Sequence, residues 1–367
     1  MKSKPVKNSK LALVIPSLQA GGMERVMSEL AGFFSEKSGL EVHLVIYGMS
    51  REIFYEIPSS VQVHKPTFKF NEGKRIISAL KTILFLRKTI KKLHPDSVLS
   101  FGEYWNSFVL IALFALKYPV FISDRCQPDK KLGTYHDYLR RILYRRSRGI
   151  VAQTEKAKEI YFKDLGHSNI SVIGNPIRQI STEKEVEREN SVLMVGRLIQ
   201  SKHHDQLIEI FLSIAEPGWK LVIVGYDHLK QHVSDKLEKL IRGHHAEGII
   251  KLEGKQSDVD RYYLGSKIFA FTSSSEGFPN VIGEAMSAGL PVIAYDCIAG
   301  PSEMIDDGRN GFLVPLFDME TFKIRVKELM NDEAKRKQFG NQARRSIQKY
   351  SINEIGEKYF EFILDNK

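Results

Sequence analysis

Short apolar runs alternate with longer amphipathic stretches along almost the whole chain. A short, bounded apolar run is typical of a strand that is buried on both faces of a parallel sheet. The first half is expected to contain such strands at Leu11–Ile15, Val42–Tyr47, Ser97–Ser100, Val120–Ile122, Gly149–Ala152 and Ile170–Ile173. The intervening stretches predict helices over Met23–Ser35, Ile76–Leu93, Trp105–Leu116 and Tyr135–Arg146.

The same alternation restarts in the second half. Strands are expected at Ser191–Val195, Lys220–Val224, Ile249–Leu252, Ile268–Thr272 and Val292–Tyr295. Helices are expected at Asp205–Ile214, Leu229–Arg242, Val259–Ser266 and Gly283–Ala288, and over most of the remaining chain. Because strands that alternate with helices form parallel sheets covered on both faces, the sequence predicts an α/β protein with two doubly wound, Rossmann-like domains.

The domain boundary is expected near a polar segment, Ser181–Asn190, that follows Asn175-Pro176. We therefore predict an N-terminal domain over residues 1–176, a linker over 177–190 and a C-terminal domain over 191–345. The last segment, 346–367, is expected to be a helix that packs back toward the N-terminal domain. Ligands of doubly wound sheets bind beyond the carboxyl ends of the strands, so two facing domains would form one cleft.

Composition narrows the class without deciding the function. The chain of 367 residues is 43% apolar and 27% charged, which is typical of a globular protein of about two domains. Its two cysteines, Cys126 and Cys297, argue against a disulfide framework or a zinc site and favour a reducing, cytoplasmic setting. The apolar run Phe108–Leu116 is shorter than the ~20 residues that span a bilayer, and the Lys-rich N-terminus lacks a signal-peptide core.

The positive charge is concentrated in the first half. Residues 1–150 contain 25 Lys and Arg against 12 Asp and Glu, a net +13, whereas the remainder, with 29 against 32, carries −3. This asymmetry indicates an anionic partner for the first half: a nucleic acid, a lipid surface or a phosphorylated substrate. No nucleic-acid-binding motif accompanies the charge, so we do not expect nucleic acid.

Two cations follow the strand Ser191–Val195. Arg197 comes directly after Gly196, and Lys202 lies five positions later in the same loop. Arg offers a planar pair of donors and Lys a compact charge, so both could bind one diphosphate. The alternative is a solvated basic loop.

Two glutamates surround the expected start of a helix near Asn280. Glu276 lies in the loop after the strand Ile268–Thr272, and Glu284 lies in the first turns of the helix. Glu284 could accept both hydroxyls of a ribose, Glu276 could contact a sugar, and the amides of Phe278 to Val281 are expected to be free donors. The alternative is that the acids only complement the helix dipole.

Gly21-Gly22 opens the first helix after the first strand. Glycine allows the backbone to approach a ligand closely, and a simple tight turn is the alternative. The G-x-G-x-x-G fingerprint of dinucleotide binding is absent.

Five segments of the chain resemble the retaining, GT-B-fold glycosyltransferases of family 4. The strongest are GRLIQSK at 196–202 and EGFPNVIGE at 276–284, a full E-x7-E motif. The weaker segments are SLQAGGMERV at 17–26, VIGNPI at 172–177 and AGLPVIAYDCIAGPSEMIDDGRNGFLVP at 288–315. The finer resemblance is to bacterial cell-surface transferases that extend lipid-linked oligosaccharides.

The resemblance implies a nucleotide-sugar donor, with UDP preferred, and no metal or other cofactor. It implies that the residues at the reacting centre are Arg197 and Lys202 on the diphosphate and Glu276 near the donor sugar. For Glu276 we favour a binding role over that of a nucleophile. It further implies that Glu284 binds the ribose and that the rest of the donor site comprises Gly21, Gly22, Phe278, Pro279, Asn280 and Val281.

Two short motifs need separate interpretation. Many relatives have a histidine where this chain has Asp124-Arg125; Arg125 could reach phosphate, Asp124 could be an acceptor-side base, or the two could form a structural ion pair. The Asp-x-Asp at Asp258–Asp260 begins a predicted helix, so we interpret Asp258 as an N-cap and not as a metal ligand. The pairs His203-His204 and His244-His245 are expected on the surface.

The acceptor is expected to be a saccharide on a polyprenyl diphosphate at the cytoplasmic face of a membrane. Two basic segments, Lys74–Leu93 and Tyr138–Arg148, suit an anionic lipid surface, and a solvated outer face is the alternative. On Lys74–Leu93 an apolar side is expected to contain Ile77, Leu80, Leu84, Ile90 and Leu93. The rival functions are a transferase with a soluble acceptor, a GDP-mannose-dependent mannosyltransferase, a nucleotide-sugar epimerase and a phosphorylase, although nothing identifies the pyridoxal-bearing lysine of the last.

Overall fold

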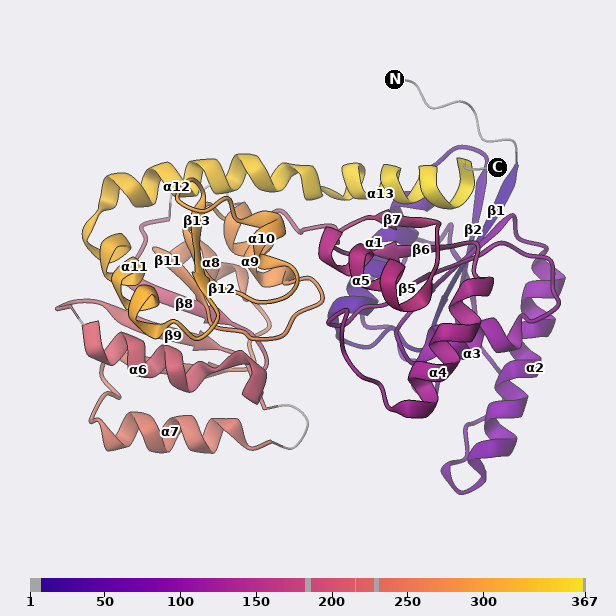
Figure 1. Ribbon diagram of the computed structural model, residues 1–367, viewed down its shortest axis with the longest axis horizontal. Coiled ribbons are helices and arrows are strands. Elements are labelled where there is room, and N and C mark those ends of the chain that lie inside the picture. The colour runs from indigo at the N-terminus through magenta and orange to yellow at the C-terminus, as the bar shows by residue number, and fades with distance from the viewer. Residues whose placement is uncertain (1–7, 182–185, 215, 228–230, 366–367) are drawn as a thin grey trace. The chain divides into compact units, whose positions relative to one another are not determined.

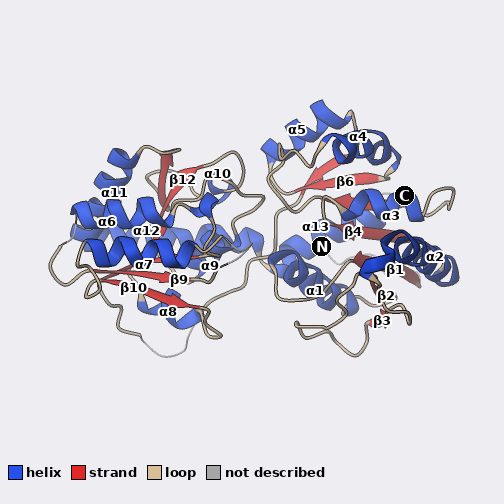
Figure 2. Ribbon diagram, turned by 90° about the horizontal axis from the view of Figure 1, so that it is seen from below, coloured by secondary structure: helices blue, strands red, loops and turns tan. Residues whose placement is uncertain are grey.

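The computed structural model describes residues 8–181, 186–214, 216–227 and 231–365. The chain divides into two compact units. Unit 1 contains residues 1–176 and 352–367, and unit 2 contains residues 177–351. Each unit is built on its own parallel sheet with helices packed against it (Figure 1; Figure 2).

The sheet of unit 1 has the strand order β3-β2-β1-β4-β5-β6-β7. Its strands are β1 (Ser9–Ile15), β2 (Leu40–Ile46), β3 (Gln62–His64), β4 (Ser97–Phe101), β5 (Val120–Ser123), β6 (Gly149–Ala152) and β7 (Ile170–Val172). All neighbouring strands are parallel, and Leu13 of β1 lies opposite both Leu44 and Leu99. The chain proceeds from β1 to β2 on one side and later returns to place β4 on the other. The topological switch point therefore lies between β1 and β4.

The helices of unit 1 cover both faces of this sheet. They are α1 (Gly22–Ser35), α2 (Arg75–Leu93), α3 (Trp105–Ala112), α4 (Thr134–Leu143), α5 (Glu155–Leu165) and α13 (Ile352–Phe360). Apolar side chains of α2, α3 and α5 form one core with alternate strand residues such as Ala12 and Val14. On α1, Phe33 contacts Gly356 of α13, where a β-carbon would lie 2.5 Å from the Phe33 ring.

The sheet of unit 2 has the strand order β10-β9-β8-β11-β12-β13 and is also parallel. Its strands are β8 (Ser191–Val195), β9 (Lys220–Val224), β10 (Ile250–Gly254), β11 (Ile268–Phe271), β12 (Val292–Asp296) and β13 (Gly311–Pro315). Its helices are α6 (His204–Ile214), α7 (Val233–Gly243), α8 (Asp260–Gly265), α9 (Asn280–Ser287), α10 (Pro301–Met304), α11 (Met319–Asn331) and α12 (Glu333–Ser346). The switch point of this sheet lies between β8 and β11.

Three elements, β3, β13 and α5, were not expected from the hydrophobic pattern. Two predicted helices also end earlier than expected: α3 ends at Ala112 and α4 at Leu143. The apolar pattern continues past both helix ends, and Leu113 and Tyr144 are buried there without being part of the α-helices. The pattern alone therefore predicted helices that were too long. The predicted helix over Leu229–Arg242 begins among residues 228–230, which lie outside the described residues.

The unit boundaries differ from the expected linker and C-terminal helix. Ile177 and Ile180 are buried, and the Ile180 N–H donates to Ser287 Oγ at 3.1 Å, so this segment packs on unit 2. Residues 346–351 also belong to unit 2, where Ile347 and Tyr350 are buried. The last helix of unit 1 therefore begins at Ile352. Of the expected linker, residues 182–185 lie outside the described part of the chain.

Candidate functional site

The cations and glutamates identified in the sequence emerge at the switch point of unit 2. Gly196 and Arg197 follow β8, and the loop 272–279 follows the adjacent strand β11. In doubly wound sheets, adjacent strands whose connections leave in opposite directions create a crevice at their carboxyl ends. The fold thus brings together two loops that are separated by more than seventy residues in the sequence.

Lys202 and Glu276 form an ion pair across these two loops. Lys202 is 9% exposed, and its Nζ lies 4.8 Å from the centroid of the Phe271 ring. The backbone around it is fixed, because Thr272 Oγ1 donates to Lys202 O at 2.8 Å and the Ser274 N–H donates to Ser201 O at 2.8 Å. An ammonium group has three donors, so Lys202 can keep its contact with Glu276 and still bind an anion.

Arg197 is exposed and lies five positions before Lys202 in the same loop. Its side chain makes no ion pair or hydrogen bond with the residues that the structure describes. The neighbouring Leu198 is anchored instead, since its N–H donates to Tyr226 O at 2.9 Å. The loop is therefore held in place by its backbone while the guanidinium group remains available to a ligand.

Glu284 lies half-buried on α9, where it accepts a hydrogen bond of 3.0 Å from the Tyr263 hydroxyl. Burial, and then the Glu284 charge, raise the pKa of Tyr263 well above its usual value, which keeps the hydroxyl protonated as a donor. This hydrogen bond helps to fix the orientation of the Glu284 carboxylate, which is the group that we consider for a ribose.

The turn at 278–280 offers fewer free amides than the sequence suggested. Phe278 is buried and packs edge-to-face on Tyr350, with ring centroids 5.4 Å apart. Pro279 has no N–H, and the Asn280 N–H already donates to Phe278 O at 3.0 Å. The expectation that every amide from Phe278 to Val281 is a free donor was therefore wrong.

The Asp-x-Asp motif shows the expected cap only as one long hydrogen bond, from the Arg261 backbone N–H to Asp258 Oδ1 at 3.5 Å. Helix α8 begins at Asp260, and its N-cap residue is Val259, whose side chain cannot accept a hydrogen bond. The distance to Asp258 is at the outer limit of a hydrogen bond, and Asp260 pairs with Arg178 at 2.6 Å. Within the described ranges, no three His, Cys, Asp or Glu side chains form a cluster suited to a metal ion.

Gly21 and Gly22 lie at the switch point of unit 1, between β1 and β4. Gly21 has an extended backbone, with φ −174° and ψ 159°, so its conformation does not require glycine. The Tyr55 hydroxyl accepts a hydrogen bond from the Gly21 N–H at 3.0 Å and donates one to Gly21 O at 2.8 Å. This pair of bonds fixes the loop that the resemblance associates with the donor.

Asp124 does not have the geometry of a general base. It is 1% exposed, accepts hydrogen bonds from Asn106 Nδ2 at 2.9 Å and Tyr144 Oη at 2.6 Å, and forms an ion pair with Arg140. A base must reach the proton that it removes, and these buried partners occupy the carboxylate instead. The structure therefore corrects this interpretation of Asp124. The ion pair that the sequence left open is real, but its cation is Arg140, not the adjacent Arg125.

Arg125 stacks 4.4 Å from the centroid of Phe101 and donates to Asn175 Oδ1. No carboxylate of the described residues pairs with it, and burial lowers the pKa of its guanidinium group. Its role toward phosphate stays a prediction.

The prediction that both histidine pairs lie on the surface was wrong for one pair. His244 and His245 are exposed, but His204 is 1% exposed and neither of its ring nitrogens has a hydrogen-bond partner in the described part of the chain. Burial, followed by the charges of Lys202 and His203, lowers the pKa of His204 to about 3, so it packs as a neutral ring beneath the Lys202 loop. His203 contacts the other loop of the site, with its Nε2 2.8 Å from Ser274 Oγ.

A small pocket lined in part by Leu198, the residue after Arg197, was missed in the sequence. It has a volume of about 270 Å³, and its lining includes Leu198, Tyr226 and Asp227. Its shape depends on Gly225, because a β-carbon there would lie 1.8 Å from Gly196 O. The signal that could have identified it is the Gly-Tyr-Asp that directly follows β9.

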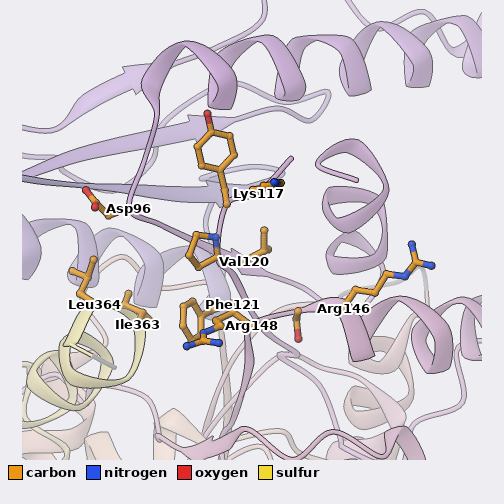
Figure 3. A pocket seen from close by; sticks show the side chains of 11 residues that line it. Asp96, Lys117, Val120, Phe121, Arg146, Arg148, Ile363 and Leu364 are labelled. Atoms are coloured by element: carbon orange, nitrogen blue, oxygen red, sulfur yellow. The ribbon is translucent and has the colours of Figure 1, made fainter. Parts of the chain in front are cut away.

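A second cavity, of about 390 Å³, lies in unit 1, at the edge of its sheet where strands β4 and β5 begin (Figure 3). Asp96, which precedes β4, and Val120, which begins β5, contribute to its lining, together with Arg146 and Arg148. Ligands of doubly wound sheets bind at the carboxyl ends of the strands, whereas this cavity lies at the amino ends. It is therefore not part of the candidate site.

Comparison with known proteins gives consistent matches over nearly the whole chain. The family model described as Glycosyltransferase Family 4 matches residues 20–178, and the one described as Glycosyl transferases group 1 matches residues 177–346. The amylovoran biosynthesis glycosyltransferase AmsD of Erwinia amylovora is 28% identical over 95% of this chain and 98% of its own.

Two further matches describe a related enzyme and a shared fold. A Campylobacter jejuni α-1,4-N-acetyl-D-galactosaminyltransferase, named for a saccharide on diphospho-undecaprenol, is 26% identical over 98% of this chain and 99% of its own. The solved structure of Anabaena HepE in complex with UDP has a TM-score of 0.80 at 17% identity, over 96% of this chain and 98% of HepE. The two parallel-sheet units therefore have the GT-B fold.

Proposed function

Because this chain belongs to the GT-B-fold glycosyltransferases of family 4, we propose that it transfers a hexose or N-acetylhexosamine, with retention, from a UDP-sugar to a saccharide on a polyprenyl diphosphate. The observation that carries this proposal is the pairing of Lys202 with Glu276, with Arg197 in the same loop as Lys202, at the switch point of unit 2. The names of the Campylobacter relative and of the UDP complex support the acceptor class and the nucleotide.

In the proposed chemistry the bond between the anomeric carbon and the diphosphate oxygen breaks, and the acceptor hydroxyl oxygen bonds to the anomeric carbon on the same face. The proton of that hydroxyl passes to the departing diphosphate. Negative charge develops on the departing nucleoside diphosphate, and Arg197 and Lys202 offset it. Fixed charges of this kind are often the largest single contribution to catalysis because they need no reorganisation. Two such cations would supply this stabilisation, so the proposal assigns no role to a divalent metal.

The two glutamates have distinct proposed roles. Glu276 binds hydroxyls of the donor sugar and holds Lys202 in position, and Glu284 binds the ribose while Tyr263 orients it. The nucleobase is proposed to occupy the pocket of about 270 Å³ next to Tyr226. We retain the sequence-based assignment of the remaining donor contacts to Gly21, Gly22, Asn280 and Val281. Phe278 and Pro279 are buried, so they shape the turn.

A thermal-shift screen tests the donor. UDP-glucose, UDP-galactose, UDP-N-acetylglucosamine, UDP-N-acetylgalactosamine and GDP-mannose are each added to the purified protein. Since stabilisation grows with the logarithm of ligand concentration over Kd, at a hundredfold excess over Kd we expect about 2.7 kcal/mol from one UDP-sugar. Stabilisation by GDP-mannose alone would contradict the UDP preference, and no stabilisation by any of the five would contradict the donor site.

The membrane-facing surface is proposed to be helix α2 of unit 1. The sequence placed Ile77, Leu80, Leu84, Ile90 and Leu93 on one apolar side, but the helix separates them. Ile90 and Leu93 are buried in the core, whereas Ile76, Ile77, Leu80 and Leu84 are each more than half exposed. These four residues recur at helical spacing, so they form one outward stripe, and the amino-terminal end of α2 extends beyond the rest of unit 1 (Figure 1).

Lysines extend the same surface toward the carboxyl end of α2. The exposed ones are Lys81, Lys88, Lys91 and Lys92. An apolar stripe with adjacent lysines is typical of a helix that lies on an anionic lipid surface. Among the described residues, no helix is both long enough and apolar enough to cross a bilayer. We therefore propose peripheral association with the cytoplasmic face of the membrane.

Flotation with vesicles tests this surface. We expect the protein to float at low salt with vesicles rich in phosphatidylglycerol but not with phosphatidylcholine alone. The reversal Lys88→Glu with Lys91→Glu should reduce binding by about tenfold or more, since each lysine contributes about 1 kcal/mol. The triple change Ile77→Ser, Leu80→Ser and Leu84→Ser should also reduce it, whereas Ile324→Ser, at an exposed position of unit 2, should not. Equal flotation of all variants would contradict the proposal.

A further inference from the structure

The switch point of unit 1 presents aromatic side chains to solvent. Tyr104 and Trp105 follow β4 at the start of α3, and each is 41% exposed. They emerge at the carboxyl edge of the sheet, next to the strand β1 that leads to Gly21. Ligands of doubly wound sheets bind at this position, but neither aromatic residue belongs to the motifs that identified the family.

Trp105 is held rigidly on its inner side. Its ring packs edge-to-face on Tyr47 and on Phe108, with centroid distances of 6.0 and 6.5 Å. Gly102, with φ +109°, allows a close approach, because a β-carbon at that position would lie 3.1 Å from Trp105 Cδ1. The indole N–H makes no hydrogen bond with the described residues. The ring therefore has a fixed orientation, an exposed part and an unused donor.

A buried polar network supports the backbone beneath these rings. Asn106 is fully buried and connects Ser100 Oγ, at 2.9 Å, with Asp124 Oδ1, also at 2.9 Å. The Tyr144 hydroxyl lies 2.6 Å from Asp124 Oδ1 and 3.3 Å from Glu103 O. The residues before and after the aromatic pair are therefore fixed to the core, which is how binding sites are kept in a productive geometry.

Polar groups surround the aromatic pair. The Glu103 carboxylate is 3.3 Å from Lys130 Nζ, and Lys130 Nζ lies 5.6 Å from the centroid of the Tyr104 ring. His136 packs edge-on to Tyr104, with ring centroids 5.2 Å apart. The surface thus combines exposed aromatic faces with a carboxylate, an ammonium and an imidazole group.

We propose that Tyr104 and Trp105 are the stacking surface for the acceptor saccharide, with Glu103 accepting hydrogen bonds from its hydroxyls. A pyranose has an apolar face of C–H groups that packs on an aromatic ring and a rim of hydroxyls that donate and accept hydrogen bonds. A rigid aromatic side chain supplies large contact area at low cost in conformational entropy. This proposal rests on the proposed function, because it names the residues of unit 1 that select the acceptor.

A lipid surface is the competing ligand, because tyrosine and tryptophan are also enriched at membrane interfaces. The observations favour the saccharide. The carboxylate of Glu103 would be repelled by anionic headgroups, and the aliphatic stripe of α2 already provides an apolar surface for lipid. The hydrogen-bonded network Asn106–Asp124–Tyr144 fixes the backbone that carries the aromatic pair. A fluid membrane can adapt to a mobile side chain, so it does not require such a fixed position.

The two tryptophans of the chain allow a direct test. Trp219 is buried in the core of unit 2, so its indole signal is an internal control. With ¹⁵N-labelled indoles, galactose, glucose, N-acetylgalactosamine and N-acetylglucosamine are titrated separately to high concentration. We expect at least one sugar to shift the Trp105 indole signal and leave that of Trp219 unchanged. If none of the four shifts the Trp105 signal, or if both signals shift together, the proposal is wrong.

Variants separate this site from the donor site. Trp105→Ala should raise the acceptor KM by about tenfold or more, with little change in the donor-induced thermal shift, and Trp105→Phe should restore part of the loss. A wild-type protein that no donor stabilises would contradict the proposed function, whatever Trp105 does. A donor-stabilised Trp105→Ala variant with a wild-type acceptor KM would overturn the stacking surface alone. If Trp105→Ala no longer floats with sugar-free vesicles but keeps a wild-type acceptor KM, the aromatic pair binds lipid instead.

Discussion

Replacing Lys202 with alanine is expected to lower kcat for sugar transfer by roughly 10²- to 10³-fold, the range measured when one preorganised donor to a developing charge is removed. The ammonium group is held between Glu276 and the Phe271 ring, so it is already oriented before a ligand binds. Its loss removes a charge-assisted bond to the departing diphosphate from a site where the donor is oriented before the charge develops. Steady-state kinetics with the donor from the thermal-shift screen measures the effect.

Removing Lys202 also leaves the Glu276 carboxylate without its partner, which could itself disturb the fold. The double variant Lys202→Met with Glu276→Gln removes both charges, and its Tm shows how much of the change in stability comes from the unpaired carboxylate. Its kinetics do not isolate Lys202, because Glu276 has its own proposed contact with the donor sugar. Lys239→Ala, at an exposed position of unit 2, is the matched control and should retain wild-type rates. Wild-type turnover in a folded Lys202→Ala variant would exclude the assigned diphosphate site. Glu284→Ala should instead weaken donor binding, because its proposed contact is with the ribose.

Asp124→Ala is expected to destabilise unit 1 by about 3–5 kcal/mol, because one member of a buried ion pair is removed and the other remains. Arg140 would be left as a buried cation, and Tyr144 and Asn106 would each lose an acceptor. A loss of this size corresponds to a decrease in Tm of roughly 10 °C for a unit of this length. Circular dichroism or calorimetry measures it.

The same variant distinguishes a structural role from a catalytic one. A general base at this position would give an inactive protein of normal stability, whereas the buried network predicts lost stability first. Asp164→Ala, an exposed aspartate of unit 1, is the control and should leave Tm unchanged. Replacing both partners, as Asp124→Leu with Arg140→Met, should restore part of the loss, since buried ion pairs can be exchanged for apolar residues of similar volume. Unchanged stability in Asp124→Ala would show that the network contributes little.

The local elements could be read from the sequence because they depend on neighbouring residues. The strands Gly149–Ala152, Ser191–Val195 and Lys220–Val224 have the predicted bounds, since each is a short apolar run with polar ends. The elements that were missed have weaker local signals. Strand β3 has only three residues. Helix α2 was predicted, but its apolar residues lie on two faces, one packed on the core and one exposed to solvent, which the pattern did not distinguish.

The residues of the candidate site could be predicted from the sequence, but their contacts could not. The sequence placed Arg197, Lys202, Glu276 and Glu284 in loops at strand ends, and that required only the order of elements along the chain. It could not show that β8 and β11 are neighbours, because strand order is decided by how the helices pack on the sheet. Contact between Lys202 and Glu276 depends on that order.

By itself, the sequence determined that this protein has two doubly wound α/β units and that charged loops follow particular strands, because periodicity and turn residues act over a few positions. Only the tertiary structure decided which polar residues are exposed. His204 was expected on the surface and is buried, and Asp124, a candidate acceptor-side base, is buried as well. The apolar side expected on α2 divides into buried Ile90 and Leu93 and exposed Leu80 and Leu84. The physical reason is that burial is set by residues distant in the chain, such as Arg140 and Tyr144 around Asp124, which come close only when the sheet and its helices assemble.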